Sequence, residues 1–467
     1  GADSAYAAIR QLPPAHVLTM RDGVERTRRY WRPWDSLVHA PTGAALPQDR
    51  RESTLIASTR EALADAVASR VPAEVPFGVF LSGGIDSGLV AVLAARAWGR
   101  PFPTFSMGIA HQGYDEAPLA RLVAQAIGSE HHEIVMDARS GERAFTEWVA
   151  RMDQPLGDPS LLPTWLLAEH ASRHVPVVLT GEGGDELFAG YPTYLGHRHA
   201  ALANGLPAPL AALALQLARR FRPRHHHVTL AHLIERFLGV RGLAPFERHL
   251  AWFGTARPNE AMSLLAAPLR AQVAAEAPLA HARALESSLA DMGLLVAGRP
   301  VPLAAYQLLD FETYLAGDLL TKVDRCTMAH GVESRAPFLR PSLIAHALGL
   351  PESLRLRGTS GKWVLKQAAR ELLPRTILDR RKQGFSPPFS TWSRGPLRGL
   401  VVDALSRERI TRAGVLDPDA VHTVLRDHLE AREDRGRTLW TLLSLQSWAE
   451  HWVAGRAPAA STTATHV

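Results

Sequence analysis

The chain has 467 residues, of which 46% are hydrophobic and 21% charged, proportions that are ordinary for a folded globular protein. This length suffices for two or three domains, or for one large core with a helical annex. No apolar run reaches about eighteen residues and no basic segment precedes an apolar one at the start, so we expect a cytoplasmic protein without membrane contact. The net charge of +6 comes from charges dispersed among acidic residues, which disfavours a nucleic-acid partner.

Two residue types are scarce enough to be informative. The single cysteine, Cys326, excludes an internal disulfide and a cysteine-rich metal site, and its helical, half-apolar surroundings predict a buried thiol. The only lysines are Lys322, Lys362, Lys366 and Lys382. The planar guanidinium of arginine does not easily replace the compact, rotatable ammonium of lysine. These four lysines are therefore candidates for function. Chance placement on a solvated helix is an equal alternative for Lys366.

The first part of the chain predicts a lead-in followed by alternating strands and helices. Residues 1–50 resemble an extended, proline-punctuated segment, and an amphipathic helix follows over residues 51–70. Four apolar runs then alternate with helical segments, namely Gly78–Leu81, Pro103–Met107, His132–Val135 and Val175–Leu179. This alternation predicts an α/β fold with a doubly wound parallel sheet in residues 51–200. Ligands of such sheets bind beyond the carboxyl ends of the strands.

The rest of the chain is expected to be mostly helical. We predict a helical insertion over residues 201–300, a large helical C-terminal part over 301–455 that completes the site, and a disordered tail over 456–467. Two histidine strings are interpreted as having no metal role. His225–His227 read as a solvated turn, and strand alternation would send His131 and His132 to opposite faces.

The segment Ser82–Ser87 is the most informative string. It reads Ser-Gly-Gly-Ile-Asp-Ser and lies between a strand-like and a helical run. Its glycines let backbone N–H groups approach an anion, and the following helix points its positive end at the same place, so the pattern predicts a phosphate-binding loop. Asp86 would repel phosphate by itself, which predicts a bridging divalent cation. The Walker pattern is absent, and an ordinary glycine-rich turn is the plain alternative.

Three later strings place charged residues beside glycines or apolar residues. Leu179–Tyr191 follows a strand-like run, with Asp185 where it could share a cation with Asp86, and with Glu182 between two glycines. In the segment 318–339, positively and negatively charged residues alternate at helical spacing. This pattern predicts either a lattice of ion pairs on the surface or a buried network of charges. The last string consists of Ser360–Trp363, which contains Lys362, and then Arg380–Phe385. In it a lysine precedes a glycine-aromatic turn, from which an ammonium can reach a phosphate or a developing oxyanion.

Taken in this order, the strings resemble the synthetase portion of glutamine-dependent asparagine synthetases of the bacterial B type, from Leu12 to about Trp452. The first loop resembles the pyrophosphate loop of the N-type ATP pyrophosphatases, which have an adenine nucleotide α-hydrolase-like fold. The resemblance implies ATP and Mg²⁺ as cofactors. It assigns ATP to Leu81, Met107, Thr180 and Gly181; pyrophosphate to Ser82, Gly83, Gly84, Asp86 and Ser87; and Mg²⁺ to Asp86 and Asp185. Glu182 matches the family's catalytic glutamate and Lys382 its lysine near the α-phosphate. Charge alone suggests a substrate network of Asp324, Arg325, Glu333 and Arg335.

The implied reaction adenylates the side-chain carboxylate of aspartate with release of pyrophosphate, after which ammonia attacks and asparagine and AMP leave. Glu182 would take a proton from the nitrogen. The chain begins at Gly1 without the nucleophilic cysteine of the family's glutaminase, so we expect that domain to be missing or a separate partner chain, and a homodimer is possible. Arg340 stands where the family usually has aspartate.

Several alternatives share parts of this pattern. A β-lactam synthetase-like or lasso-peptide cyclase-like enzyme would use another carboxylate or amine, although β-lactam synthetases carry tyrosine at the position of Glu182, which favours ammonia here. A tRNA-thiolating enzyme would need more cysteines than Cys326. A non-catalytic nucleotide-binding protein would be expected to lack Asp86, Glu182 or Asp185, and all are present.

Overall fold

The computed structural model divides the chain into two compact units, each built from separate segments. It describes residues 3–35, 48–111, 115–220, 230–256, 258–273, 277–380 and 386–456. Unit 1 comprises residues 1–137, 163–253 and 279–387, and unit 2 comprises residues 138–162, 254–278 and 388–467. Lys382, His225–His227 and the predicted tail beyond residue 456 lie outside the described residues. The domain boundaries predicted above stay a proposal.

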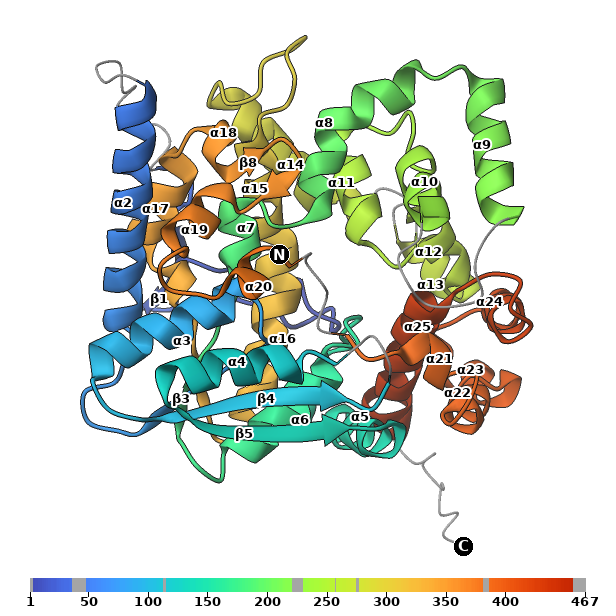
Figure 1. Ribbon diagram of the computed structural model, residues 1–467. Helices are drawn as coiled ribbons and strands as arrows, with labels where there is room; N and C mark the ends of the chain where they lie inside the picture. The colour runs from blue at the N-terminus through green and yellow to red at the C-terminus, as the bar shows by residue number, and fades with distance from the viewer. Residues whose placement is uncertain are drawn as a thin grey trace, which may run out of the picture. The chain divides into compact units, whose positions relative to one another are not determined.

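Unit 1 is organised around a parallel sheet (Figure 1). Its strands lie in the order β5-β4-β3-β6-β7, and they are β3 (Phe77–Phe80), β4 (Pro103–Ile109), β5 (Glu130–Met136), β6 (Val177–Leu179) and β7 (Glu333–Arg335). All four neighbouring pairs are parallel. The chain therefore runs outward from β3 in one direction and returns to its other side, which confirms the predicted doubly wound sheet. The strand β7 was not predicted, because its Glu-Ser-Arg sequence contains no apolar run.

Helices cover both faces of this sheet. Arg121 of α4 (Ala117–Ile127) forms an ion pair with Glu133 of β5 on one face. On the other face, the ring of His170 in α6 (Leu161–Ala171) packs against Phe105 of β4. Between these layers β3, β4 and β6 are almost completely buried, whereas the edge strands β5 and β7 are partly exposed. The helix α3 (Ile85–Trp98) buries its residues from Ser87 to Ala94. Side chains of neighbouring residues in a strand thus enter different environments.

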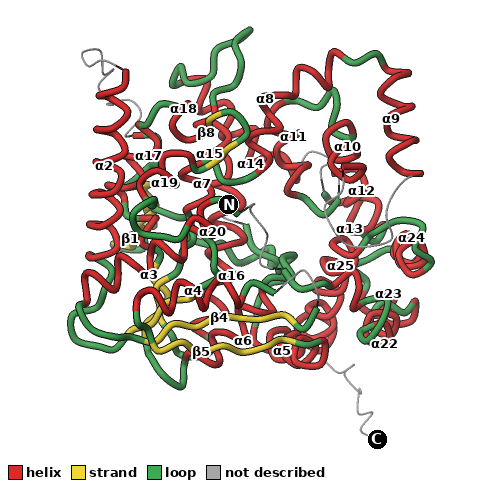
Figure 2. Tube along the Cα trace, in the orientation of Figure 1, coloured by secondary structure: helices red, strands yellow, loops and turns green. Residues whose placement is uncertain are grey.

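Most of the described chain is helical (Figure 2). The other helices of unit 1 are α2 (Gln48–Ala68), α7 (Gly184–Phe188), α8 (Pro192–Gly205), α9 (Ala208–Arg220), α10 (Leu230–Leu238), α11 (Pro245–Phe253), α14 (Ala277–Asp291), α15 (Leu303–Asp310), the π-helix η1 (Phe311–Leu319), α16 (Leu320–Met328), the 3₁₀-helix η2 (Pro337–Leu339), α17 (Pro341–Gly349), α18 (Glu352–Arg355), α19 (Trp363–Ala368) and α20 (Arg375–Leu378).

Two antiparallel hairpins complete unit 1, and the first corrects the prediction of an extended lead-in. The strands β1 (His16–Arg21) and β2 (Val24–Arg29) pair around Asp22 and Gly23, which have φ of 52° and 75°. An Asp-Gly pair with both φ positive suits a tight hairpin turn. The exposed, charged strands gave no apolar alternation to predict them. The second hairpin joins β8 (Leu356–Arg357) and β9 (Ser360–Gly361).

Unit 2 is helical and has its own aromatic core. Trp440 of α25 is buried and makes edge contacts with Phe145 and Phe389, at ring centroid distances of 5.3 and 5.2 Å. Its helices are α5 (Ala138–Arg151), α12 (Pro258–Leu264), α13 (Ala267–Gln272), α21 (Phe389–Trp392), α22 (Arg398–Ala404), α23 (Arg407–Ala413), α24 (Pro418–Leu429), α25 (Gly436–Trp448), the π-helix η3 (Ala449–Val453) and the 3₁₀-helix η4 (Ala454–Arg456).

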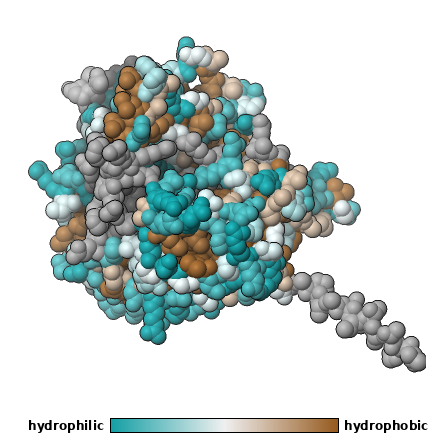
Figure 3. All heavy atoms as spheres, turned by 90° about the vertical axis from the view of Figure 1, so that its right-hand side faces the viewer, coloured by the Kyte–Doolittle hydropathy of each residue, from teal (hydrophilic) through white to brown (hydrophobic). Residues whose placement is uncertain are grey.

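The surface is mainly hydrophilic on the face that Figure 3 shows, where hydrophobic residues gather in separate patches. None of the described helices has the length and apolar character that a membrane span requires. Cys326 is buried, as its apolar helical surroundings predicted.

Candidate active site

The candidate site lies at the switch point of the sheet. The strands β3 and β6 are neighbours, and each leads directly into one of the two glycine-rich loops. Since parallel strands end at the same edge, the loop Ser82–Ser87 after β3 and the loop that begins at Thr180 after β6 come together. Sequence analysis predicted this meeting of the two loops.

The first loop is held by its own hydroxyl groups. The Oγ of Ser87 accepts a hydrogen bond from the backbone N of Ser82 at 3.1 Å and lies 3.0 Å from the Ser82 Oγ. Gly83 has φ of 69°, and a Cβ there would come within 2.7 Å of Leu119 in α4. Glycine is therefore required at this turn for both conformation and space. The helix α3 begins directly after it, so its positive N-terminal end faces the loop.

The second loop packs on the first with no room for side chains. A Cβ on Gly181 would lie 2.9 Å from the backbone N of Ser87, and a Cβ on Gly184 would lie 2.7 Å from the Asp86 carboxylate carbon. These contacts bring Asp185, the next residue, to the start of α3. Glycine is needed at these positions because the backbones of the two loops touch. The sequence pattern indicated glycine-rich loops here, but it did not reveal this contact.

The two predicted metal-binding carboxylates converge on one cation, the ammonium of Lys362. Its Nζ lies 2.7 Å from Oδ1 of Asp185 and also donates to Oδ2 of Asp86. All three side chains are largely buried, with exposures of 7% for Lys362, 8% for Asp185 and 14% for Asp86. The scarcity of lysine made Lys362 a candidate for function, but its contact with these two carboxylates was not predicted from the sequence.

The backbone around Lys362 is shaped to deliver this ammonium. Lys362 follows β9 and has φ of 54°, an uncommon conformation for a residue other than glycine. Its N–H donates to the Phe188 carbonyl at 2.8 Å. A Cβ on Gly190 would lie 2.2 Å from Cε of Lys362 and 2.0 Å from Oδ1 of Asp185. The absence of a side chain at position 190 thus leaves the space that the lysine occupies.

Two glutamates lie close by, Glu182 in the second loop and Glu186 in the helix α7 that follows it. Glu182, the predicted base, is half-buried directly after Gly181. Glu186 is fully buried, and burial together with the neighbouring Asp185 raises its pKa to about 8. The hydroxyl of Tyr191 donates to Glu186 at 2.6 Å. Glu186 is therefore mostly protonated at neutral pH, whereas Glu182 is the carboxyl with access to a ligand.

The residues predicted to contact ATP are close to the carboxyl ends of the strands. Leu81 and Met107 are buried, and the backbone N of Leu81 donates to the Phe105 carbonyl at 2.8 Å. Thr180 is 4% exposed and its Oγ1 makes no hydrogen bond. A buried hydroxyl without a partner is costly unless a ligand or water meets it. This orphaned donor, two glycine-rich loops without room for side chains and a pair of converging carboxylates fit a nucleotide with its divalent cation.

Lys382 lies outside the described residues, but the residue before that segment is anchored beside the first loop. Arg380 forms an ion pair with Glu116 at 2.7 Å, and both side chains are at most 19% exposed. The carbonyl of Glu116 would lie 3.1 Å from a Cβ on Gly83. The ion pair therefore holds Arg380, two positions before Lys382, beside the loop Ser82–Ser87. Sequence analysis missed this role of Glu116 and Arg380, because it depends on a contact between distant segments.

Of the four residues suggested as a substrate network, Glu333 and Arg335 have structural partners. Glu333 and Arg335 form an ion pair with each other at 2.7 Å on β7, and Arg335 also donates to the Arg70 carbonyl at 3.0 Å. Asp324 and Arg325 are exposed on α16. Arg340, where the family usually has aspartate, donates to the Asp65 carbonyl in the last turn of α2 at 2.7 Å. Arg340 thus has a structural role, because it contacts the end of α2.

The strand order, together with the glycine-rich loops at the point where that order reverses, defines a doubly wound α/β protein with a loop of the phosphate-binding type. Residues 58–450 match the family model described as asparagine synthase, so the chain belongs to the asparagine synthase family.

Known relatives agree with this assignment. A putative glutamine-hydrolyzing asparagine synthetase of Mycobacterium bovis is 34% identical over 388 residues, which are 83% of this chain and 56% of that protein. Glutamine-hydrolyzing asparagine synthetase 1 of Bacillus subtilis is 28% identical, over 86% of this chain and 60% of that protein. An amidase of Penicillium rubens is 24% identical over 92% of the chain and 66% of that protein. The chain therefore spans less than two thirds of the length of the two synthetases.

Proposed function

We propose that this chain is the synthetase part of an ATP-dependent amide-forming enzyme that converts aspartate and ammonia to asparagine. The observation that carries the proposal is the convergence of Asp86 and Asp185 on one cation between two glycine-rich loops, beside Glu182. Two carboxylates around one positive charge are what a Mg²⁺-bound triphosphate needs. Membership of the asparagine synthase family supports the same reading.

The first step is adenylation. An oxygen of the aspartate side-chain carboxylate attacks the α-phosphorus of ATP, the bond to the β-phosphate oxygen breaks, and β-aspartyl-AMP and pyrophosphate form. The loop Ser82–Ser87 binds the departing pyrophosphate through backbone N–H groups and the hydroxyls of its serines. Asp86 and Asp185 would hold Mg²⁺, which offsets the negative charge of the phosphates. Lys382 lies on the segment anchored by Arg380 and would stabilise charge at the α-phosphate.

The second step is amide formation. Ammonia attacks the acyl carbon, the bond to AMP breaks, and the extra proton on nitrogen passes to the Glu182 carboxylate. Glu182 suits this role better than Glu186, because burial and Asp185 raise the pKa of Glu186 and leave it protonated. The names of the synthetase relatives support glutamine as their source of ammonia, and we propose a glutaminase domain or chain as the partner of this one.

A second candidate is an amide-forming ligase of secondary metabolism with another carboxylate or amine. The amidase-named fungal relative and Arg340 favour it. The hydrogen bond of Arg340 to the Asp65 carbonyl weakens the second argument, because it gives arginine a structural reason to be there.

The two candidates are separated by offering the purified chain ATP, Mg²⁺ and either L-aspartate with ammonium or a panel of other carboxylates and amines. Pyrophosphate release and the mass of the amide product are followed together. Asparagine as the product supports the first candidate. Pyrophosphate release only with another carboxylate supports the second, and no pyrophosphate release with any pair contradicts both.

A further inference from the structure

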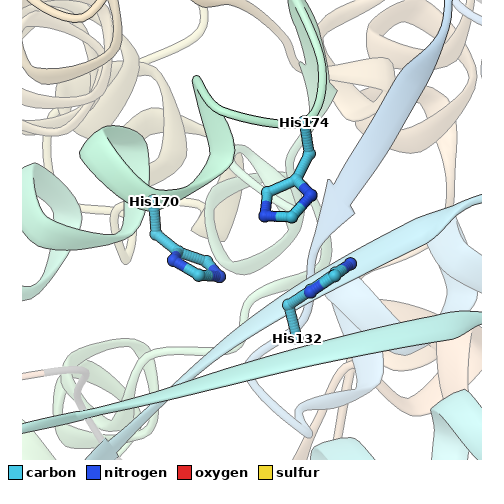
Figure 4. Close-up of side chains that lie close together, drawn as sticks. All are labelled: His132, His170 and His174. Carbon is cyan, nitrogen blue, oxygen red and sulfur yellow. The ribbon is translucent and has the colours of Figure 1, made fainter.

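Three histidine side chains from separate elements gather on the face of the sheet opposite α4 (Figure 4). They are His132 on β5, His170 in the last turn of α6, and His174 just after that helix. One ring nitrogen from each lies within 4.8 Å of the others. Among the described residues, these three histidines form a group whose possible ligand atoms lie close enough together to hold one metal ion.

Strand alternation explains why His132 reaches this place and His131 does not. The ring of His131 lies 2.9 Å from the Thr104 hydroxyl and 3.0 Å from that of Ser106, on the face of α4. The ring of His132 stacks on Phe105 at 5.4 Å and lies 4.1 Å from the His174 ring. The prediction of opposite faces is confirmed. The interpretation that the pair has no metal role did not consider histidines from α6 and from the connection after it.

The polar and charged surroundings of the three rings are compatible with a bound cation. The Nε2 of His132 is buried and makes no hydrogen bond, although Oε1 of Glu130 lies 3.1 Å away. The other charged groups near the rings, Glu169 and Arg173, pair with each other at 3.4 Å. Neutral imidazoles with an unused ring nitrogen are the usual ligands of transition metals.

We propose that His132, His170 and His174 form a binding site for one divalent transition-metal ion of the Zn²⁺ class. Three imidazoles leave the fourth tetrahedral position for water or for the exposed Glu130 carboxylate. At Zn–N bonds of about 2.0–2.1 Å the ligand atoms would be about 3.3 Å apart. The present spread of up to 4.8 Å closes with small side-chain rotations, since His174 is exposed and free of packing constraints on one side.

The position of this histidine site in the sheet assigns it a structural role. His132 lies in register with Phe105 of β4 and, through it, with Phe80, the last residue of β3, whereas His174 precedes β6 by three residues. The glycine-rich loops follow the carboxyl ends of β3 and β6. A bound ion would link the edge strand β5 to the connection between α6 and β6, on the face of the sheet opposite α4. None of the three histidines is among the residues proposed to bind nucleotide or substrate, so the inference is independent of the proposed reaction.

The test is a metal titration of the full chain after removal of bound metal with a chelator. Because His225–His227 could bind metal by themselves, the background carries H225A, H226A and H227A. We expect one equivalent of Zn²⁺ by calorimetry, and with Co²⁺ the visible absorption of a tetrahedral complex. His132→Ala, His170→Ala and His174→Ala should each weaken Zn²⁺ binding at least tenfold, roughly the loss that follows removal of even an outer partner of a metal ligand.

The matched control is His199→Ala, an exposed histidine of α8. This substitution should change the Zn²⁺ affinity by no more than about twofold, because surface substitutions away from a site have small effects. Circular dichroism without metal checks folding, and His174→Ala, at the most exposed of the three positions, serves if His132→Ala does not fold. Zn²⁺ binding that is absent, or unchanged in His174→Ala, contradicts the proposal. A Zn²⁺-dependent rise in melting temperature that disappears in His174→Ala but persists in His199→Ala supports it.

Discussion

The ammonium of Lys362 lies 2.7 Å from Oδ1 of Asp185 and also binds Asp86, so a lysine neutralises the two carboxylates proposed to hold Mg²⁺. Both carboxylates are largely buried. Without a cation their charges would repel in a region of low dielectric, and the loops that carry them would separate. In the absence of metal, Lys362 keeps the site assembled.

This relationship predicts the behaviour of Lys362→Met. Removing one partner of a buried ion pair leaves uncompensated charge, and we expect a loss of about 3–5 kcal/mol in the free energy of unfolding without metal. Mg²⁺ should stabilise the variant more than it stabilises the wild type, because it replaces the missing positive charge. Urea unfolding with and without Mg²⁺ measures both effects.

The matched control for this variant is Lys366→Met. Lys366 is half-buried one turn further along α19, and its Nζ donates to the Ser360 hydroxyl at 3.3 Å. Its removal should cost much less stability and should create no extra response to Mg²⁺. Equal responses of the two variants would contradict the assignment of Lys362 to the carboxylate pair.

Glu182→Gln separates the two proposed steps. The amide keeps the size of the side chain but cannot take a proton, so pyrophosphate release should continue while amide formation slows by about 100-fold or more, the usual contribution of a general base. Rapid-quench assays that follow pyrophosphate and asparagine separately give both rates. Asparagine formation at the wild-type rate would show that Glu182 is not the base.

The ion pair between Arg380 and Glu116 predicts a loss of positioning. Arg380→Ala should release the start of the segment that carries Lys382, lowering kcat for pyrophosphate release while the stability changes little. Arg380→Lys should restore part of the rate, since an ammonium can still reach the Glu116 carboxylate. A control at Arg375, an exposed residue of α20, should leave kcat unchanged. If Arg380→Ala and Arg375→Ala behave alike, the anchor has no role in the reaction.

The raised pKa of Glu186 predicts how stability depends on pH. The carboxyl has a pKa of about 8 when folded and an ordinary value near 4.5 when unfolded. Between these values the folded state holds a proton that the unfolded state lacks, so this group's contribution to stability is complete below pH 4.5 and is lost as pH rises to about 8. Glu186→Gln should flatten that part of the profile. Urea midpoints between pH 5 and pH 8.5 test this, and an unchanged slope in the variant would contradict the assignment.

A buried network predicts a separate stability effect. Asp310 accepts from the Tyr194 hydroxyl and lies 2.8 Å from Nε2 of His249, and all three residues are buried. Asp310→Ala leaves the Tyr194 hydroxyl and Nε2 of His249 without partners, while Nδ1 of His249 keeps its contact with His197, at a cost of about 1–3 kcal/mol for each group that loses its partner. Asp291→Ala, at the exposed end of α14, should cost almost nothing. Urea unfolding compares the two variants, and equal losses would show that the network contributes little.

Local patterns made much of the fold predictable. The apolar runs gave β3, β4, β5 and β6 to within about two residues, and the glycine-rich loops after two of them marked the switch point. The strand β7 and the hairpin of β1 and β2 were not predicted, because short or exposed strands show no apolar alternation.

The contacts that complete the site join segments far apart in the chain. Lys362 and Asp86 are 276 positions apart, and Arg380 and Glu116 are 264 apart. No local spacing encodes such contacts, although the scarcity of lysine pointed toward Lys362. The histidine cluster required the fold in the same way, because His132 acquires its partners only when α6 packs against the sheet.

The central claim is that the loops around Asp86 and Asp185 adenylate aspartate. The most direct measurement is isotope transfer from L-aspartate labelled with ¹⁸O in its side-chain carboxylate, with ATP, Mg²⁺ and ammonium. Attack of that carboxylate on the α-phosphorus predicts one ¹⁸O atom in the AMP released with each asparagine, and no transfer with Asp86→Asn. AMP free of ¹⁸O while asparagine forms, or label found in inorganic phosphate beside ADP, would contradict adenylation.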